Sequence, residues 1–185
     1  MITTHDVTEH PLVLVDENDQ PVGLMEKMEA HRRALLHRAF SVFLFNKKGD
    51  MLLQRRALKK YHSGGLWTNT CCSHPFPHET PQEAAKRRIR EELGFDADAT
   101  PAFHFIYKAA LDNDLTEYEY DHVLLGQYDG PVFPNEDEVG DYCYQSMSEL
   151  KQNLSSHPDK YTAWFRIAFP LLEEYLKKLN SNDSK

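Results

Sequence analysis

Two cysteines and a histidine that could do chemistry lie in the segment TNTCCSHP, residues 68–75. In an extended chain, side chains two positions apart point to the same face. Cys72 and His74 would therefore share one face while Cys71 points away. A thiol and an imidazole directed to one space can belong to a metal site, a nucleophile with its base, or an acid–base thiol beside a metal-bound imidazole. A zinc knuckle is disfavoured, because no second Cys-x-x-Cys follows.

A second group of reactive side chains lies in the segment EYEY, where Glu117 and Glu119 alternate. On a strand both carboxylates would point to one face. Like charges side by side destabilise each other unless a cation or a shared proton lies between them. An exposed polar strand face is the simpler interpretation. Together with His31, His37 and His74, however, these carboxylates would form a mixed nitrogen and oxygen site suited to Mn²⁺, Mg²⁺ or Zn²⁺.

A well-delimited helix is expected over residues 81–93. Thr80 is its N-cap, Pro81 suits the first helical position, and Glu83 completes a capping box. Gly94 supplies the stop. The helix has an apolar stripe facing a core and a charged opposite face.

The rest of the chain predicts short strands and terminal helices around this helix. Strands are expected over residues 12–15, 22–25, 40–45, 51–56, 102–111, 116–128 and 141–144. Residues 146–149 can begin a small helix, and residues 162–179 form an amphipathic helix that Pro170 ends or kinks. Because His31 and His37 are six positions apart, they cannot stack on one helix face, and a shared site requires a bend between them. This order of elements predicts an α+β sandwich.

The composition of the chain limits the classes of protein to which it can belong. The chain has 185 residues, of which 41% are apolar and 27% charged, and a formal net charge of −8 that argues against binding nucleic acid. The 10 histidines suggest a metal, and the 3 cysteines fit a reducing compartment rather than a disulfide framework. We see no signal peptide and no membrane-spanning run. We expect one cytoplasmic domain over residues 1–185, with N-terminal strands in about 1–30, a disordered tail at 180–185, and neither a nucleic-acid nor a membrane partner.

The capped helix also lies in a segment that resembles the Nudix box, G-x5-E-x7-R-E-U-x-E-E-x-G-U. Glu79, Arg87, Glu91 and Glu92 match it, whereas Ser73 replaces the first glycine. In addition, Arg88 stands where the box has a glutamate. That box normally gathers carboxylates around several Mg²⁺ ions, and the remaining glutamates suffice for one hard cation. A solvated charged helix face is the alternative interpretation.

Taken together, LHRAFS at residues 36–41, WTNTCCSHP at 67–75, the altered box and the Glu-x-Glu strand resemble type I isopentenyl-diphosphate delta-isomerase. The resemblance runs from about residue 12 to about residue 170. It implies a Nudix-like α/β/α sandwich with a mixed sheet and flanking helices. It also implies an isomerase of isoprenoid biosynthesis that converts isopentenyl diphosphate to dimethylallyl diphosphate by transposing a C=C bond. The substrate would be a small-molecule isoprenoid diphosphate, and the enzyme would be a monomer or a homodimer.

The resemblance assigns roles residue by residue. The catalytic residues would be Cys72, Glu119 and Tyr107, and the ligands of a Mn²⁺, Mg²⁺ or Zn²⁺ ion would be His31, His37, His74, Glu117 and Glu119. Glu92 and the backbone carbonyl of Cys72 would hold a Mg²⁺ on the substrate diphosphate. The diphosphate itself would be bound by Lys27, Arg56, Lys60 and Arg88. Trp164 would cover the hydrocarbon, and Trp67 is a second candidate wall whose alternative role is core filling.

Other interpretations remain open from the sequence. One is a Nudix pyrophosphohydrolase of a nucleoside diphosphate compound, which would release phosphate. Another is a metal-binding regulatory module without catalysis. Among the remaining histidines, His62 lies in a basic loop where it could approach phosphate, and the others are expected on the surface or on strand faces. Cys71 and Cys143 are expected to be small buried hydrophobic residues.

Overall fold

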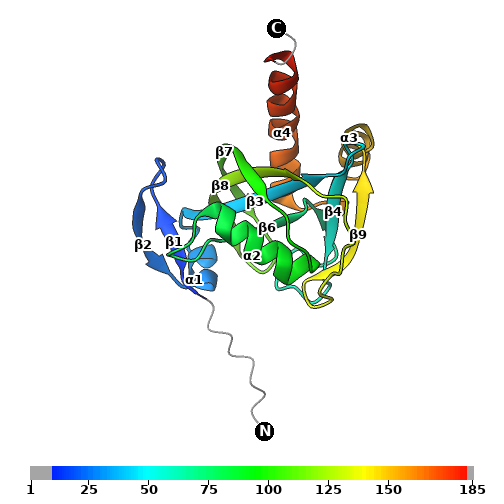
Figure 1. Cartoon of the computed structure of the whole chain (residues 1–185). Coiled ribbons are helices and arrows are strands. Elements are labelled where there is room, and N and C mark those ends of the chain that lie inside the picture. Colours follow the sequence, from blue (N-terminus) through cyan, green and yellow to red (C-terminus); the bar gives the residue numbers. More distant parts are fainter. Residues whose placement is uncertain (1–9, 183–185) are drawn as a thin grey trace.

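The computed structural model describes residues 10–182, which form the elements shown in Figure 1. The strands are β1 (Leu12–Val15), β2 (Pro21–Met25), β3 (His37–Phe45), β4 (Met51–Arg56), β5 (Trp67–Thr68), β6 (Cys71–Ser73), β7 (Ala99–Ala110), β8 (Thr116–Gln127) and β9 (Val139–Gln145). The helices are α1 (Lys27–Arg32), α2 (Pro81–Leu93), α3 (Met147–Ser156) and α4 (Ala163–Asn182), with a 3-10 turn η1 (Pro158–Lys160) between the last two.

Strand β3 organises the sheet. It pairs antiparallel with β1, β4 and β6 and parallel with β8, so the sheet is mixed. The parallel register begins at His37 beside Glu119, and the antiparallel register of β6 sets Ser41 beside Cys72. Residues far apart in sequence are thereby brought to one region of the sheet.

Helices cover both faces of the sheet, because alternate residues of its central strands are apolar on both sides. Phe40, Val42 and Leu44 of β3 pack in a core with α2. Phe43 of the same strand packs in a second core with α4, where Phe165 is fully buried. Figure 1 shows α2 crossing the sheet, with the strands behind it. The expected α/β/α sandwich with a mixed sheet is therefore confirmed.

Local sequence signals set the ends of α2 and α3. The Thr80 side chain accepts a hydrogen bond from the Glu83 backbone N–H at 3.3 Å, and the Glu83 carboxylate accepts from the Thr80 N–H at 2.8 Å. Gly94 ends α2 in the left-handed conformation, with φ 72°. Ser146 and Glu149 form the same capping box at the start of α3. These capping predictions are confirmed.

The C-terminal helix does not end at Pro170, which contradicts one of the two outcomes predicted for this proline. Proline lacks an N–H donor and clashes with the preceding turn, so Pro170 was expected to end or kink the helix. Helix α4 instead runs through it from residue 163 to 182. Phe169 before the proline and Leu172 after it are both buried against the sheet, and this packing outweighs the local cost. Residues 180–182 of the expected tail are helical, and residues 183–185, like 1–9, lie outside the described part.

None of the helices within residues 10–182 combines the length and the apolar character that crossing a membrane requires.

Candidate active site

A cleft opens beside the C-terminal part of α2. Its walls come from α1, the segment after β4, β6, α2, the β7–β8 hairpin and α4. The lining residues are Lys27, Arg56, Lys60, Tyr61, His62, Cys72, Ser73, His74, Arg88, Glu92, Tyr107, Glu117, Glu119 and Trp164. The cleft thus collects cations, carboxylates, a thiol and an indole.

Three imidazoles and a carboxylate converge next to this cleft, and two of these residues, His74 and Glu119, line it. One ligand atom from each of His31, His37, His74 and Glu119 lies within 4.8 Å of the others. Residues 33–36 make the bend that this grouping requires, with Ala34 in the left-handed region at φ 49°. The rings of His31 and His37 are consequently 5.0 Å apart.

The hydrogen bonds of His31 and His37 prepare these rings for a cation. Nδ1 of His31 lies 2.7 Å from the Lys27 carbonyl, and Nδ1 of His37 lies 2.8 Å from the Leu35 carbonyl. A carbonyl can only accept, so each Nδ1 carries the proton and each Nε2 presents a lone pair. Both Nε2 atoms are buried and have no hydrogen-bond partner. Neutral imidazoles oriented by a backbone carbonyl are typical metal ligands, so the donor set fits a divalent cation.

Glu119 is the negative member of this group. Its Oε1 lies 3.0 Å from His74 Nε2 and 3.5 Å from His37 Nε2, and its Oε2 accepts a hydrogen bond from the Tyr107 hydroxyl at 2.7 Å. Burial opposes ionisation, but the hydrogen bond with His74 outweighs it and holds the pKa of Glu119 well below its ordinary value. Glu119 is therefore the ionised carboxylate of the site.

Glu117 lies beside the four-residue cation site rather than within it. Its Oε2 accepts from the Tyr107 hydroxyl at 2.9 Å, and its Oε1 is 3.9 Å from His62 Nε2. Burial, together with the nearby charge of Glu119, raises the pKa of Glu117 well above its ordinary value. The expected alternation on β8 is confirmed, since both carboxylates reach the same tyrosine.

The two adjacent cysteines face opposite sides of β6, as the alternation predicts. Cys72 lines the cleft, whereas Cys71 is fully buried in the core against α2. Burial raises the pKa of the Cys72 thiol well above its ordinary value, while the charge of Arg56 opposes the shift. Cys72 is thus a neutral thiol in a cleft that also contains a carboxylate.

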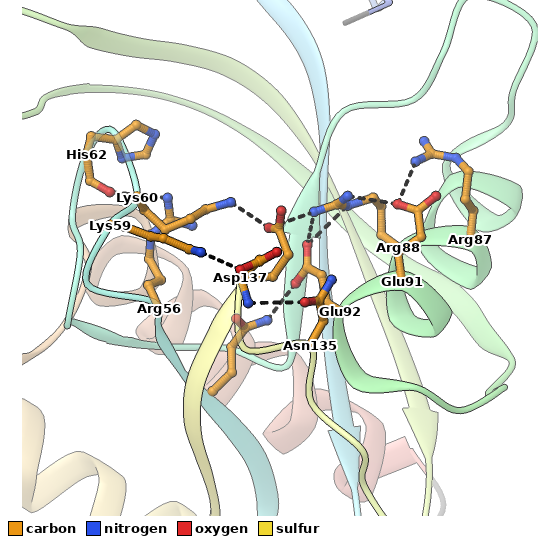
Figure 2. A network of polar contacts seen from close by, with 12 residues as sticks. Arg56, Lys59, Lys60, His62, Arg87, Arg88, Glu91, Glu92, Asn135 and Asp137 are labelled. Atoms are coloured by element: carbon orange, nitrogen blue, oxygen red, sulfur yellow. Dashed lines mark hydrogen bonds and ion pairs between the residues drawn. The ribbon is translucent and has the colours of Figure 1, made fainter. Parts of the chain in front are cut away.

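Basic side chains enter the cleft from separate elements. Lys27 begins α1 with its Nζ 4.8 Å above the ring of Tyr61, and Arg56 ends β4 beside the ring of Trp164. Lys60 and Arg88 both bind Oε2 of Glu138, at 2.5 and 3.1 Å. Figure 2 shows Lys60 reaching across from the segment after β4 and Arg88 from α2.

Glu92 lies at the edge of this basic group. Its Oε1 accepts from Arg88, and its Oε2 accepts from the Gln54 amide at 2.8 Å. The other acidic residues of the box point elsewhere. Glu79 forms two hydrogen bonds with Arg87, and Glu91 is a half-exposed partner of Arg88. The box therefore supplies one carboxylate to the cleft, together with an arginine.

Trp67 does not line the cleft. It lies in β5 and is half-buried at the margin of the α4 core, with Arg55 5.8 Å from its ring. The Thr162 backbone N–H also donates to its carbonyl at 3.0 Å. The geometry supports its alternative role of core filling, whereas Trp164 has its ring in the cleft wall and is 2% exposed.

The structure adds residues to the site that were minor candidates or no candidates from the sequence: His62, Tyr61, Gln54 and Glu138. His62 is buried in the cleft wall, and burial, followed by the charge of Arg56, lowers its pKa to about 3. The sequence feature that pointed to His62 was its position two residues after Lys60 in the basic loop. Glu138 carried no signal, because its partners come from two distant segments.

Comparisons with known proteins agree with this geometry. Residues 35–165 match the NUDIX domain family. The chain is 48% identical over 174 residues to the isopentenyl-diphosphate Delta-isomerase of Pectobacterium atrosepticum, covering 94% of this chain and 97% of that protein. It is 50% identical over 155 residues to isopentenyl-diphosphate Delta-isomerase 2 of Photorhabdus laumondii, covering 84% and 88%.

Solved structures resemble the fold. A protein of Deinococcus radiodurans superposes with a TM-score of 0.70 at 18% identity, covering 87% of this chain and 98% of that one. The MutT protein of Methanosarcina mazei superposes with a TM-score of 0.62 at 20% identity, covering 77% and 94%. At these identities the likeness concerns the fold alone.

Proposed function

The chain belongs to the Nudix family and, within it, to the isopentenyl-diphosphate Delta-isomerases, and from this premise we propose how its cleft works. The enzyme moves a double bond by one carbon, from isopentenyl diphosphate to dimethylallyl diphosphate. One proton is added to an alkene carbon and another is removed two carbons away. Two proton-transfer groups that reach the substrate from different sides are the minimum for this reaction.

Cys72 and Glu119 are the residues we propose for these transfers. They enter the cleft from different strands, β6 and β8, and Tyr107 binds the carboxylate of Glu119 at 2.7 Å. The tyrosine fixes the orientation of that carboxylate. We propose Glu119 with Tyr107 as the group that donates the proton and Cys72 as the group that receives one at the other face, after one proton has passed from the neutral Cys72 thiol to the ionised Glu119 carboxylate.

A divalent cation fits the group formed by His31, His37, His74 and Glu119, because the buried Nε2 atoms of His31 and His37 have no other partner. We propose Mn²⁺, Mg²⁺ or Zn²⁺, with Glu117 as an additional ligand. When bound, such an ion would withdraw charge from Glu119 and make the proton that Glu119 has taken up easier to give. The residues around Glu119 hold its carboxylate in the cleft wall.

The basic residues of the cleft suit a diphosphate. Arg56 and Arg88 can bind phosphate oxygens through two N–H groups each, and Lys27 and Lys60 act as point charges. We propose that Glu92 holds a Mg²⁺ that accompanies the diphosphate. Binding at the diphosphate supplies energy away from the reacting carbons. The ring of Trp164 lines the hydrocarbon end and helps to exclude water from the tertiary cation that protonation creates.

One observation carries this proposal: a thiol and a carboxylate share a cleft with Lys27, Arg56, Lys60 and Arg88. A pyrophosphohydrolase would need several carboxylates around Mg²⁺, and Arg88 occupies one of those positions. A non-catalytic metal module would not need the thiol. The test is product analysis after incubation with isopentenyl diphosphate and Mg²⁺. Dimethylallyl diphosphate without free phosphate supports the isomerase, and phosphate release contradicts it.

We further propose that the protein works in the cytoplasm, because its cysteines are free thiols, as a reducing compartment allows. Its partner would be a small isoprenoid diphosphate and not a nucleic acid. Its oligomeric state, monomer or homodimer, stays a prediction.

A further inference from the structure

The carboxylate of Glu117 is held on one side and faced by an imidazole on the other. Its Oε2 accepts from the Tyr107 hydroxyl at 2.9 Å. Its Oε1 lies 3.9 Å from Nε2 of His62. That separation is longer than a hydrogen bond, yet a small side-chain rotation would close it. Glu117 is 5% exposed and His62 is 4% exposed, so little water competes for either group.

The other ring nitrogen of His62 has a partner, the Ser63 hydroxyl, that can either donate or accept, so it allows the tautomer that donates to Glu117. Nδ1 lies 3.2 Å from the hydroxyl oxygen of Ser63. When that hydroxyl donates to Nδ1, the neutral ring carries its proton on Nε2. The Nε2–H group then points at Glu117 Oε1 as a donor.

Aromatic neighbours fix the plane of the His62 ring. It lies nearly perpendicular to the rings of Tyr61 and Trp164, at interplanar angles of 87° and 86°. Arg56 also donates to the His62 carbonyl at 3.2 Å. The imidazole is therefore held by side chain and backbone together.

The loop that carries His62 is bound to the hairpin that carries Glu117. The Ser63 backbone N–H donates to the Asp112 carboxylate at 3.0 Å, and the Asn113 amide donates to the Tyr61 carbonyl at 2.9 Å. Asp112 and Asn113 lie in the turn between β7 and β8. The residues on both sides of His62 are thus tied to the turn that joins the strands of Tyr107 and Glu117.

We propose that His62 is a positioning residue that donates from Nε2 to Glu117 and, opposite Tyr107, fixes this carboxylate beside the four-residue cation site. The inference rests on the proposed function in one respect, that Glu117 serves the divalent cation. It goes further because it adds a fourth imidazole, outside the cation site, whose place depends on the loop and the β7–β8 turn.

The test compares His62→Ala with His62→Gln, whose amide can place an N–H group near the position of Nε2. Mn²⁺ affinity is measured by titration of the metal-free protein without substrate. Loss of a residue that orients a metal ligand weakens affinity by about 10- to 100-fold, so we expect that loss for His62→Ala. We expect His62→Gln to stay within about threefold of the unchanged protein. Equal affinity for His62→Ala and the unchanged protein, or no recovery in His62→Gln, overturns the proposal.

The role of the turn is tested by Asn113→Gly. Asn113 has φ 60°, which glycine adopts freely, so this change removes the amide and keeps the turn. We expect Mn²⁺ affinity to fall by several-fold, and an unchanged affinity overturns the link between turn and loop. Because these Mn²⁺ titrations use no substrate, their results can be interpreted independently of the isomerase proposal. Tight Mn²⁺ binding without isomerisation would contradict that proposal alone, whereas no Mn²⁺ binding to the unchanged protein would overturn this inference.

Discussion

Arg88 donates from Nε and Nη2 to a single carboxylate oxygen of Glu92, one helical turn further along α2. In the Nudix box the position of Arg88 holds a glutamate, and the chain here carries the opposite charge. The exchange turns a metal-binding position into a cation that faces the same cleft as Lys60. A helix typical of diphosphate hydrolysis is thereby suited to hold a diphosphate without cleaving it.

The first prediction concerns Arg88→Lys. Lysine keeps the charge but loses the paired N–H groups, so we expect KM for the diphosphate substrate to rise by about 10-fold. We expect kcat to change by less than about threefold, because the lost contact binds substrate and transition state alike. Steady-state kinetics measure both. Arg90→Lys is the control, since Arg90 is exposed and pairs with Asp96. An unchanged KM for Arg88→Lys would remove it from the diphosphate site.

The second prediction uses the adjacent cysteines. Cys72→Ala removes a proposed proton-transfer group, so we expect kcat to fall by about 10²- to 10⁴-fold while the fold is kept. Cys71→Ala removes a buried core atom, and we expect it to lower the free energy of unfolding by about 1 kcal/mol without changing kcat. Turnover and denaturant unfolding are measured for both. Near-normal turnover of Cys72→Ala would refute the proposed mechanism.

The third prediction concerns the cation. Protein purified without chelator should contain a divalent metal, and chelation should lower Tm, because a ligand bound to the folded state stabilises it by about 2.7 kcal/mol at 100 times its Kd. His37→Ala should lose the metal, since the buried Nε2 of His37 belongs to the cation site. The exposed His157 provides the control His157→Ala. Elemental analysis that finds no metal in the unchanged protein would contradict the site.

The fourth prediction concerns pH and stability at Glu79. Burial raises the pKa of Glu79, but its hydrogen bonds with Arg87 outweigh burial and bring it below the ordinary value of 4.5. A lowered folded-state pKa gives stability that is present above pH 4.5 and is lost as the pH falls through the folded-state value. Glu79→Gln should therefore reduce the free energy of unfolding at pH 7 by about 1–3 kcal/mol.

That difference should shrink as the pH falls from 4.5 through the folded-state pKa of Glu79, because the unchanged glutamate then becomes neutral as well. Denaturant unfolding at a series of pH values measures it. A difference that stays constant down to pH 3 would show that the ion pair with Arg87 is not the cause.

Much of this architecture could be predicted because the signals are local. The capping boxes at Thr80 and Ser146 set where two helices begin, and alternation along β8 placed Glu117 and Glu119 on one face. The alternation that directs Cys72 into the cleft and Cys71 into the core is of the same kind. Each of these depends on backbone geometry over a few residues.

The remaining features depend on contacts between distant segments. Helix α4 continues through Pro170 because Phe169 and Leu172 pack on the sheet, which the local propensity of proline does not reveal. His62 enters the cleft because its loop is bonded to Asp112 and Asn113, about 50 positions away. Trp67 lies outside the cleft because a short strand directs its ring to the margin of the α4 core.

We propose above all that this cleft transfers protons to and from an isoprenoid diphosphate and leaves its phosphates intact. Proton NMR of isopentenyl diphosphate with the metal-loaded enzyme and Mg²⁺ in D₂O tests it most directly. We predict conversion to dimethylallyl diphosphate with deuterium in the newly formed methyl group and no free phosphate. Release of phosphate, or isopentenyl diphosphate left unchanged by folded, metal-loaded enzyme, would contradict it.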